Sequence, residues 1–196
     1  MQNSFKRFFE TIKNVRKEKK IFLFLLAFFF YIDSVYTIID MAYGTALGFE
    51  STGLLLALLS QVVAFPFAIL FGRLSSKYEA AKLIRVCILA YLGISIFAIF
   101  LTKQWQFWLL AVLVGMFQGG IQSLSRSYFT KIIPLEKSGE YFGLMDVCGK
   151  GASFLGTTVV GVLSQTTGQI NFSLGALSVF FMLGIVFFRM SEKREG

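Results

Sequence analysis

Long apolar segments alternate along this chain with short polar connections. Six such segments are each about 17–24 residues long, which is the length that an α-helix needs to cross a hydrocarbon core of roughly 30 Å. Within a segment the apolar positions are continuous and do not alternate, so helices are favoured over strands. The pattern predicts an all-α, integral membrane bundle of six helices over residues 21–188. The expected spans are residues 21–44, 52–71, 84–101, 106–125, 141–164 and 170–188.

The basic residues predict how this bundle is oriented. A basic, amphipathic lead-in (residues 1–20) precedes the first span, and a short tail (residues 189–196) follows the last. With six spans, 17 of the 19 Lys and Arg residues fall on one side of the membrane. Because cytoplasmic loops are enriched in Lys and Arg, both termini are expected in the cytoplasm. Of the other two, Lys103 lies on the opposite side and Lys150 lies within the fifth span.

Composition supports a bilayer protein and excludes several other classes. The chain is 56% hydrophobic and 15% charged, whereas soluble domains carry about 25% charged residues. The net charge of +8 reads as a topology signal and a contact for anionic headgroups, not as a nucleic-acid surface. There is no histidine, and the two cysteines lie in apolar runs. No metal, cofactor or enzymatic activity is therefore predicted.

A polar stripe interrupts the first span. Asp33, Tyr36, Thr37 and Asp40 are spaced i, i+3, i+4 and i+7, so they share one face of a helix. A carboxylate in hydrocarbon costs several kcal/mol unless something satisfies it, and such residues usually face a bundle interior or a wet cavity. The stripe predicts a surface that handles a polar solute inside the membrane.

The fourth and fifth spans carry further polar groups at a similar depth. The helical rise places Asp33 about 18 Å and Lys150 about 14 Å from one side of the membrane, and Gln118 about 18 Å from the other. We expect Asp33 and Lys150 to face a shared cavity, with Gln118 on its wall and Gln122 one turn deeper. Two simpler interpretations remain open: Lys150 pairs with Asp146 along its own helix, or Asp33 caps a break in a neighbouring helix.

Two more groups have expected roles. Arg126 with Glu140 would form a gate at the cytoplasmic mouth, near Asp146; alternatively, Arg126 only anchors the topology by extending to the interface. Small residues let helices approach closely. Four glycines of the fourth and fifth spans are therefore expected to pack helices, including any partner half: Gly115, Gly119, Gly156 and Gly161.

Several stretches resemble the major facilitator superfamily. The connection from Gly72 to Lys82 resembles the signature loop of that superfamily, although Ser76 stands where the loop has an acidic residue. Residues 30–40, 119–127 and 134–150 are similar to the second half of the branch that includes vacuolar amino-acid effluxers linked to autophagy and their bacterial relatives.

This resemblance implies one half of a twelve-helix transporter. In such a half the first and fourth helices line the central cavity, the second and fifth meet the other half, and the third and sixth lie outside. The resemblance implies six further helices before Met1. The chain would then be the tail of an interrupted or split gene, an expressed half of a longer protein, or a half-size transporter that forms a dimer.

The expected function is secondary active transport of a small polar solute by alternating access, and the resemblance implies amino acids as the class of solute. Asp33 would contact a substrate ammonium or carry a coupling proton, Lys150 would hold Asp33 ionised or meet a substrate carboxylate, and neutral side chains would supply hydrogen bonds. The expected partners are the lipid bilayer, the solute and a second six-helix half. The alternative is a non-transporting six-helix remnant, or a structural membrane protein without its N-terminal half; a channel is disfavoured because no filter sequence is visible.

Overall fold

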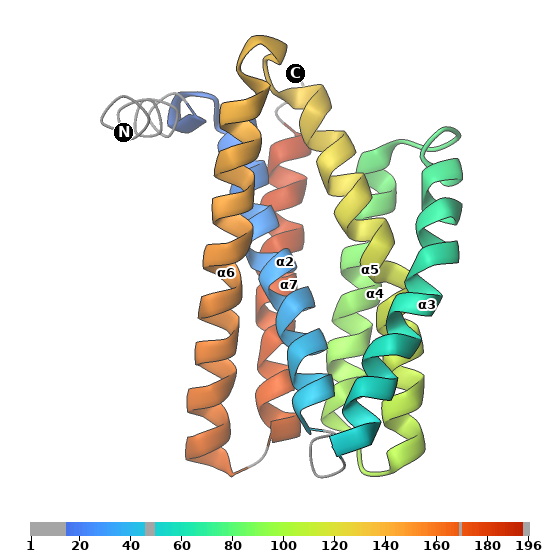
Figure 1. Ribbon diagram of the computed structural model, residues 1–196. Coiled ribbons are helices and arrows are strands. Elements are labelled where there is room, and N and C mark those ends of the chain that lie inside the picture. The colour runs from blue at the N-terminus through green and yellow to red at the C-terminus, as the bar shows by residue number, and fades with distance from the viewer. Residues whose placement is uncertain (1–14, 46–49, 169, 194–196) are drawn as a thin grey trace.

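Long α-helices make up almost all of the structure. The computed structural model describes residues 15–45, 50–168 and 170–193, and within these ranges there are no strands. The predicted all-α class is confirmed (Figure 1). Most of the lead-in, and the last residues of the tail, lie outside the described residues. In chain order the elements are α2 (Lys19–Thr45), α3 (Glu50–Leu74), α4 (Ala80–Ile99), α5 (Gln104–Ile132), the 3₁₀-helix η2 (Leu135–Lys137), α6 (Ser138–Thr167) and α7 (Ile170–Glu192).

Local sequence signals set the helix ends. The Gln106 side chain accepts the backbone N–H of Lys103 at 2.8 Å and so caps the start of α5. That helix stops before Pro134, because a residue preceding proline disfavours the helical conformation, and Ile133 is extended. Gly168 ends α6 with a left-handed φ of 68°, which glycine adopts at little cost.

The helices extend beyond the apolar segments that predict them. Five of them, α3 to α7, contain segments long and apolar enough to cross a membrane among the residues the structure describes. The helix α5 reaches Ile132 and α6 begins at Ser138, where the apolar pattern predicts limits at residues 125 and 141. Charged residues near those limits, such as Arg126, are therefore held on regular helices.

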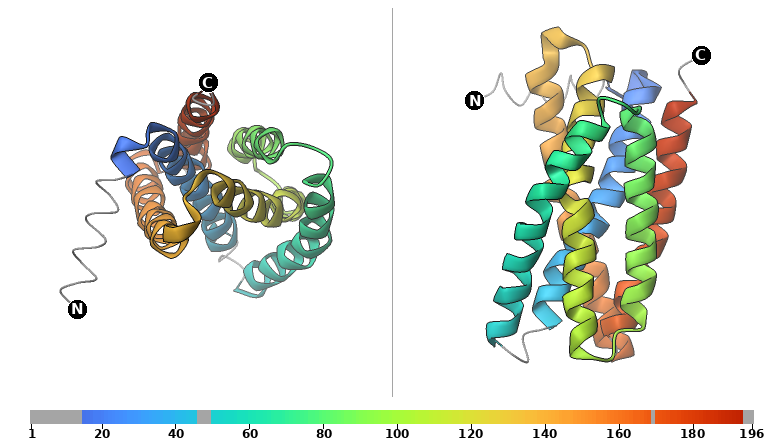
Figure 2. Two further views of the ribbon diagram at one scale, coloured as in Figure 1. Left: turned by 90° about the horizontal axis from the view of Figure 1, so that it is seen from above. Right: turned by 90° about the vertical axis from the view of Figure 1, so that its right-hand side faces the viewer.

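The helices form an arc with a second row behind it. Seen end-on, α2 and α5 lie in the middle, α6 and α3 flank them on one side, and α7 and α4 lie on the other (Figure 2). The direct packing partners agree with this view, since α3 packs on α5, α6 on α2, and α4 on both α5 and α7. The helix α2 contacts all the others and is the most buried.

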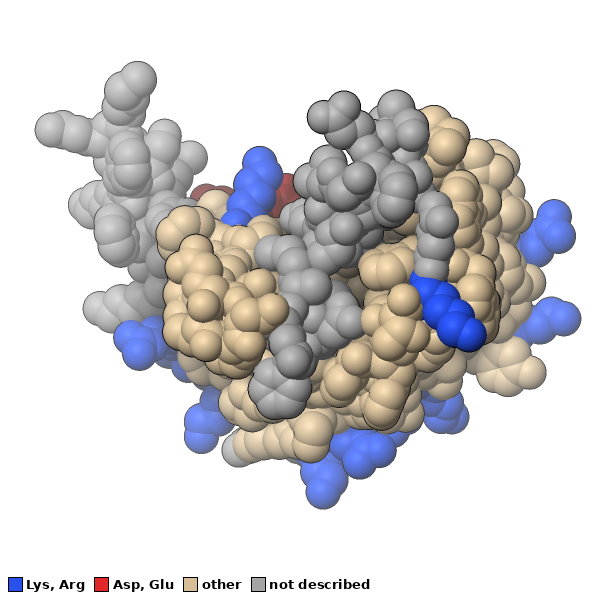
Figure 3. Space-filling model, turned by 90° about the horizontal axis from the view of Figure 1, so that it is seen from below, with Lys and Arg blue, Asp and Glu red and all other residues tan. Residues whose placement is uncertain are grey.

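The start of α2 and the end of α7 lie side by side at one end of the bundle. The Ser191 hydroxyl, near the end of α7, donates to the carbonyl of Lys20, near the start of α2, at 2.9 Å. The opposite end, seen in Figure 3, shows mostly uncharged residues where it is described, and most of the Lys and Arg visible in that view lie around its rim. The basic residues thus mark one end of the bundle.

Aromatic rings fill the core around α2. Phe24 is fully buried and stacks on Phe129 of α5, with ring centroids 5.4 Å apart. Tyr91 of α4 stacks on Phe181 of α7 at 5.7 Å. Inside a bilayer such packing stabilises helix association through van der Waals contact, since lipid chains are as apolar as the side chains.

The glycine ridge of α5 is occupied by α3. A Cβ atom on Gly115 would lie 2.6 Å from the backbone oxygen of Ser60, and one on Gly119 would lie 2.9 Å from the Cβ of Ala68. The close helix contact at these glycines is thus made by α3 of the same chain, which lies where the sequence also allowed a partner half.

Candidate functional site

A buried carboxylate joins α2 to α6. Asp33 is 1% exposed, and its Oδ1 accepts the backbone N–H of Gly156 at 3.0 Å. Thr37, one turn further along α2, is also buried against Gly156, where a Cβ atom would overlap Thr37 Oγ1 and both carboxylate oxygens. The polar stripe therefore turns into the bundle at Asp33 and Thr37, and the contact depends on glycine at position 156.

The remaining two residues of the stripe are Tyr36 and Asp40. Tyr36 and Asp40 lie on α2, but their side chains lie outside the described residues. Their expected role in solute or proton binding stays a prediction.

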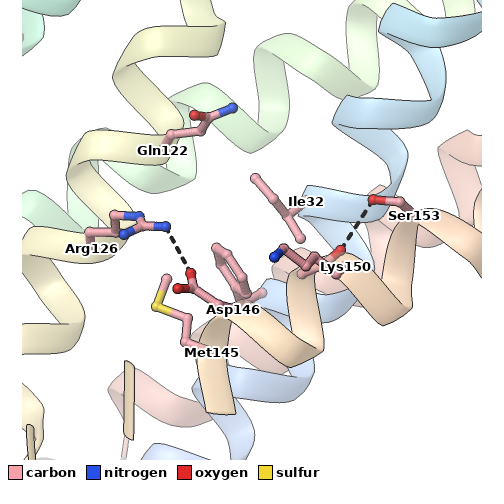
Figure 4. Close-up of a pocket in the computed structure, with 9 residues that line it drawn as sticks. Ile32, Gln122, Arg126, Met145, Asp146, Lys150 and Ser153 are labelled. Atoms are coloured by element: carbon pink, nitrogen blue, oxygen red, sulfur yellow. Dashed lines mark hydrogen bonds and ion pairs between the residues drawn. The ribbon is translucent and has the colours of Figure 1, made fainter. Parts of the chain in front are cut away.

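A cavity of about 340 Å³ opens between α2, α5 and α6 (Figure 4). Gln122 and Arg126 reach it from α5, and Asp146 and Lys150 from α6. Its apolar wall consists of Phe28 and Ile32 from α2 with Met145 from α6. The cavity thus combines charged and amide groups on two helices with an apolar surface on the third.

An ion pair crosses the cavity between α5 and α6. Arg126 Nη2 lies 2.8 Å from Asp146 Oδ1. The expected pairing of Arg126 with Glu140 is wrong, and so is the alternative pairing of Asp146 with Lys150. Glu140 precedes Asp146 by six residues, so it is turned about 240° around the helix and cannot present its carboxylate on the same side.

Exchanging the charges of this pair should reveal its role. Both side chains are at least half exposed, so we expect Arg126→Asp or Asp146→Arg alone to change the free energy of unfolding by less than about 1 kcal/mol. If the pair controls solute access, each single variant lowers transport and the double exchange restores it. Flux into liposomes measures this; a double variant no better than the singles would contradict a gating pair.

Lys150 extends its ammonium into the cavity (Figure 4). Among the described residues it forms no ion pair, and the expected pairing with Asp33 is absent. Asp33 lies level with Gly156, which is six residues, or about 9 Å, further along α6 than Lys150. Depths counted from the ends of the apolar segments differ by only about 4 Å for these two residues, so the count missed most of this offset.

The two glutamines have different surroundings. Gln122 lines the cavity, whereas Gln118, one turn away, does not. The Gln118 Oε1 atom is buried and accepts no hydrogen bond in the described part of the chain. The prediction that Gln118 lies on the cavity wall is therefore wrong, and Gln122 lies there instead.

Of the expected packing glycines on α6, only Gly156 is enclosed. No atom of the described residues lies within 4 Å of a Cβ placed on Gly161. Its expected packing role therefore has no counterpart among the described residues.

Sequence reasoning missed one buried contact beside the cavity. The Tyr31 hydroxyl lies 2.6 Å from Ser125 Oγ, which in turn donates to the carbonyl of Ile121. Both side chains are buried and join α2 to α5. A hydroxyl-bearing ring in the middle of an apolar run was the signal that could have revealed this contact, since buried hydroxyls need partners.

The comparisons agree with a membrane transporter class. The chain matches the family described as "Vacuole effluxer Atg22 like" over residues 1–196. It belongs to this family, and it is an integral membrane protein whose fold is an all-α membrane bundle.

One of the relatives is a transporter by name, and others are named autophagy-related proteins. The chain is 44% identical over 187 residues to YxiO of Bacillus subtilis, which is described as an uncharacterized MFS-type transporter. This match covers 94% of this chain and 44% of the relative. The chain is 25% identical over 211 residues to autophagy-related protein 22 of Kluyveromyces lactis, covering 100% of this chain and 43% of the relative. The chain thus spans less than half the length of these relatives. No solved structure matches the chain.

Proposed function

We propose that this chain is one half of a secondary active transporter whose solute is a small zwitterion of the amino-acid class. The cavity between α2, α5 and α6 carries this proposal. Its volume of about 340 Å³ lies in the range of small-molecule sites, roughly 300–1,000 Å³. It offers a cation, an amide and an apolar wall within one space.

The cavity chemistry suits the groups of an amino acid. Lys150 would bind the solute carboxylate, and Gln122 would hydrogen-bond to it from the facing helix. Asp146 forms an ion pair with Arg126 at 2.8 Å, and it would bind the solute ammonium when that pair opens. The apolar wall formed by Phe28, Ile32 and Met145 would take an uncharged side chain.

The second half would cover the open side of this cavity. The flanking helices α3 and α6 carry large apolar side chains that are mostly exposed, including Phe65 at 71% and Phe154 at 73%. A six-helix half packed across these helices would enclose the cavity, and rocking of one half against the other would expose it to each side in turn. In this proposal the basic end of the bundle faces the cytoplasm of a bacterial plasma membrane.

Asp33 would act behind the cavity and not in it. Its hydrogen bond to the Gly156 N–H joins the two helices whose relative position shapes the cavity. We propose that Asp33 carries the coupling proton, because binding or loss of a proton at this carboxylate changes a contact on which the spacing of α2 and α6 depends.

A flux experiment separates this function from the alternative of a non-transporting remnant. The chain would be placed in liposomes alone and together with the N-terminal half of the Bacillus subtilis relative, with that whole relative as the reference. We expect amino-acid flux only when both halves are present. Absence of flux from the paired halves, while the reference transports, would favour the remnant.

Truncating Lys150 should raise the KM for a zwitterionic solute. With Lys150→Ala we expect an increase of about 10-fold or more, since a charge-assisted hydrogen bond contributes roughly 1.5–3 kcal/mol. The matched control is Lys131→Ala, an exposed lysine of α5 outside the cavity, which should leave KM unchanged. Flux measured against concentration gives both values; equal KM in the two variants would remove Lys150 from the binding site.

A further inference from the structure

A second cluster of charges lies on the other side of the bundle, at its basic end. A hollow of about 620 Å³ is formed by one residue of α4 and the last turns of α7. Three of its residues are cationic (Arg85, Arg189 and Lys193), one is acidic (Glu192), and Val186 and Met190 form its apolar floor. This hollow shares no residue with the cavity proposed for the solute.

The hollow continues into an apolar stripe along α7. Met182, Val186 and Met190 are spaced i, i+4 and i+8, so they share one face of the helix, and they are 54%, 50% and 44% exposed. With Val179 (55% exposed) the stripe runs for about 17 Å along the helix at the standard rise. The charged cluster thus lies at the end of an exposed apolar track that leads toward the middle of the membrane.

The cluster is held in place by contacts on both sides. Arg85 Nε lies 3.5 Å from Glu192 Oε2, which ties α4 to the end of α7. The adjacent Ser191 hydroxyl donates to the Lys20 carbonyl, so the same turn is also attached to α2. Three cations against one carboxylate leave a net positive site whose position is fixed relative to three helices.

From this geometry we infer a binding site for an anionic phospholipid. The phosphate group would bind to the guanidinium groups of Arg85 and Arg189 and the ammonium of Lys193, and one acyl chain would lie along the apolar stripe of α7. Guanidinium forks match phosphate oxygens, and basic hollows between membrane helices at a cytoplasmic surface suit such headgroups. This inference requires that the bundle spans a membrane with α4 and α7 facing the lipid, and it does not require transport activity.

The side of the bundle identifies the occupant as lipid. The helices α4 and α7 form the row behind α2 and α5, on the side away from α3 and α6 (Figure 2). A second half placed over the solute cavity would therefore leave this row in contact with the bilayer. Cations at the end of a helix also interact favourably with the helix dipole and help to set the topology. Both of these effects occur without a bound lipid.

Native mass spectrometry of the purified chain tests the inference. The chain would be titrated with phosphatidylglycerol, phosphatidylcholine or inorganic phosphate, and bound molecules counted. A cation near an anionic surface contributes about 1 kcal/mol, or roughly 5-fold, so the variant Arg85→Gln/Arg189→Gln/Lys193→Gln should lose at least about 25-fold in phosphatidylglycerol affinity. The matched control, Arg73→Gln/Lys77→Gln/Lys131→Gln, removes as many exposed cations elsewhere and should lose less than about 2-fold.

A variant that should raise the lipid affinity distinguishes loss of the site from misfolding. Glu192→Gln removes the acidic group and should raise phosphatidylglycerol affinity by about 5-fold. Long-chain phosphatidylglycerol should bind more tightly than a short-chain form, because only the former covers the stripe. The inference is overturned if both triple variants lose equally, if Glu192→Gln brings no gain, if phosphatidylcholine binds as tightly, or if inorganic phosphate displaces the lipid at equal concentration.

Discussion

Replacing Gly115 by leucine should separate α3 from α5 and destabilise the bundle by about 3 kcal/mol. A Cβ atom at this position would lie 2.6 Å from the backbone oxygen of Ser60 and 3.1 Å from its Cα. Backbone atoms cannot rotate away as a side chain can, so the two helices must move apart along their whole contact. Unfolding in mixed micelles, followed by circular dichroism, measures the change.

Gly93→Leu provides the matched control. Gly93 is an exposed position of α4, and no atom of the described residues lies within 4 Å of a Cβ placed there. The same substitution should leave the free energy of unfolding within about 0.5 kcal/mol of the wild type. An equal loss in both variants would mean that leucine itself, and not the close approach of α3, disturbs the bundle.

The spacing of glycines predicted this close contact but not its partner. A GxxxG pair indicates a place where a helix can approach, and it carries no information about which helix does so. The matching signal lies on α3, where Ser60, Ala64 and Ala68 are spaced i, i+4 and i+8 and lie against the two glycines. The stripe of small residues on α3 is the sequence signal that identifies this helix as the partner.

The burial of Asp33 could be predicted from solvation energy, but its partner could not. A carboxylate in the middle of a membrane must be satisfied, which predicts an inward orientation. The partner is a backbone N–H at Gly156, and a main-chain donor leaves no charged or polar residue in the sequence to indicate it. Lys150 is a cation at a similar depth along its span, so the sequence alone favours Lys150 as the partner.

The cavity was only partly predictable for a similar reason. Gln122, Arg126, Asp146 and Lys150 all stand out as polar residues in apolar surroundings, and the structure gathers them in one space. Their pairing depends on rotation around α6 and on where that helix begins. The apolar pattern gives neither with the accuracy of one turn, which is about 5 Å.

Removing the Asp33 carboxylate should abolish transport by the assembled protein. Asp33→Ala takes away the acceptor that holds α2 to α6, and we expect flux to fall by about 100-fold or more, since an interaction with a charged group contributes roughly 1.5–3 kcal/mol and the coupling proton is lost as well. Asp33→Asn keeps an oxygen that can accept the Gly156 N–H, so its stability should stay within about 1 kcal/mol of the wild type. This variant should still exchange solute across the membrane but fail to accumulate it with a proton gradient.

The glycine on the other side of the contact supplies an independent test. Gly156→Ala places a methyl group where the Asp33 oxygens and Thr37 Oγ1 now lie, so it should lower flux without altering any titratable residue. Gly151→Ala on the same helix meets no described atom within 4 Å and should transport normally. Liposome flux with and without a proton gradient distinguishes the roles. If Asp33→Asn accumulates solute as well as the wild type, Asp33 is a structural link only; if Gly156→Ala behaves like Gly151→Ala, the contact between α2 and α6 does not control transport.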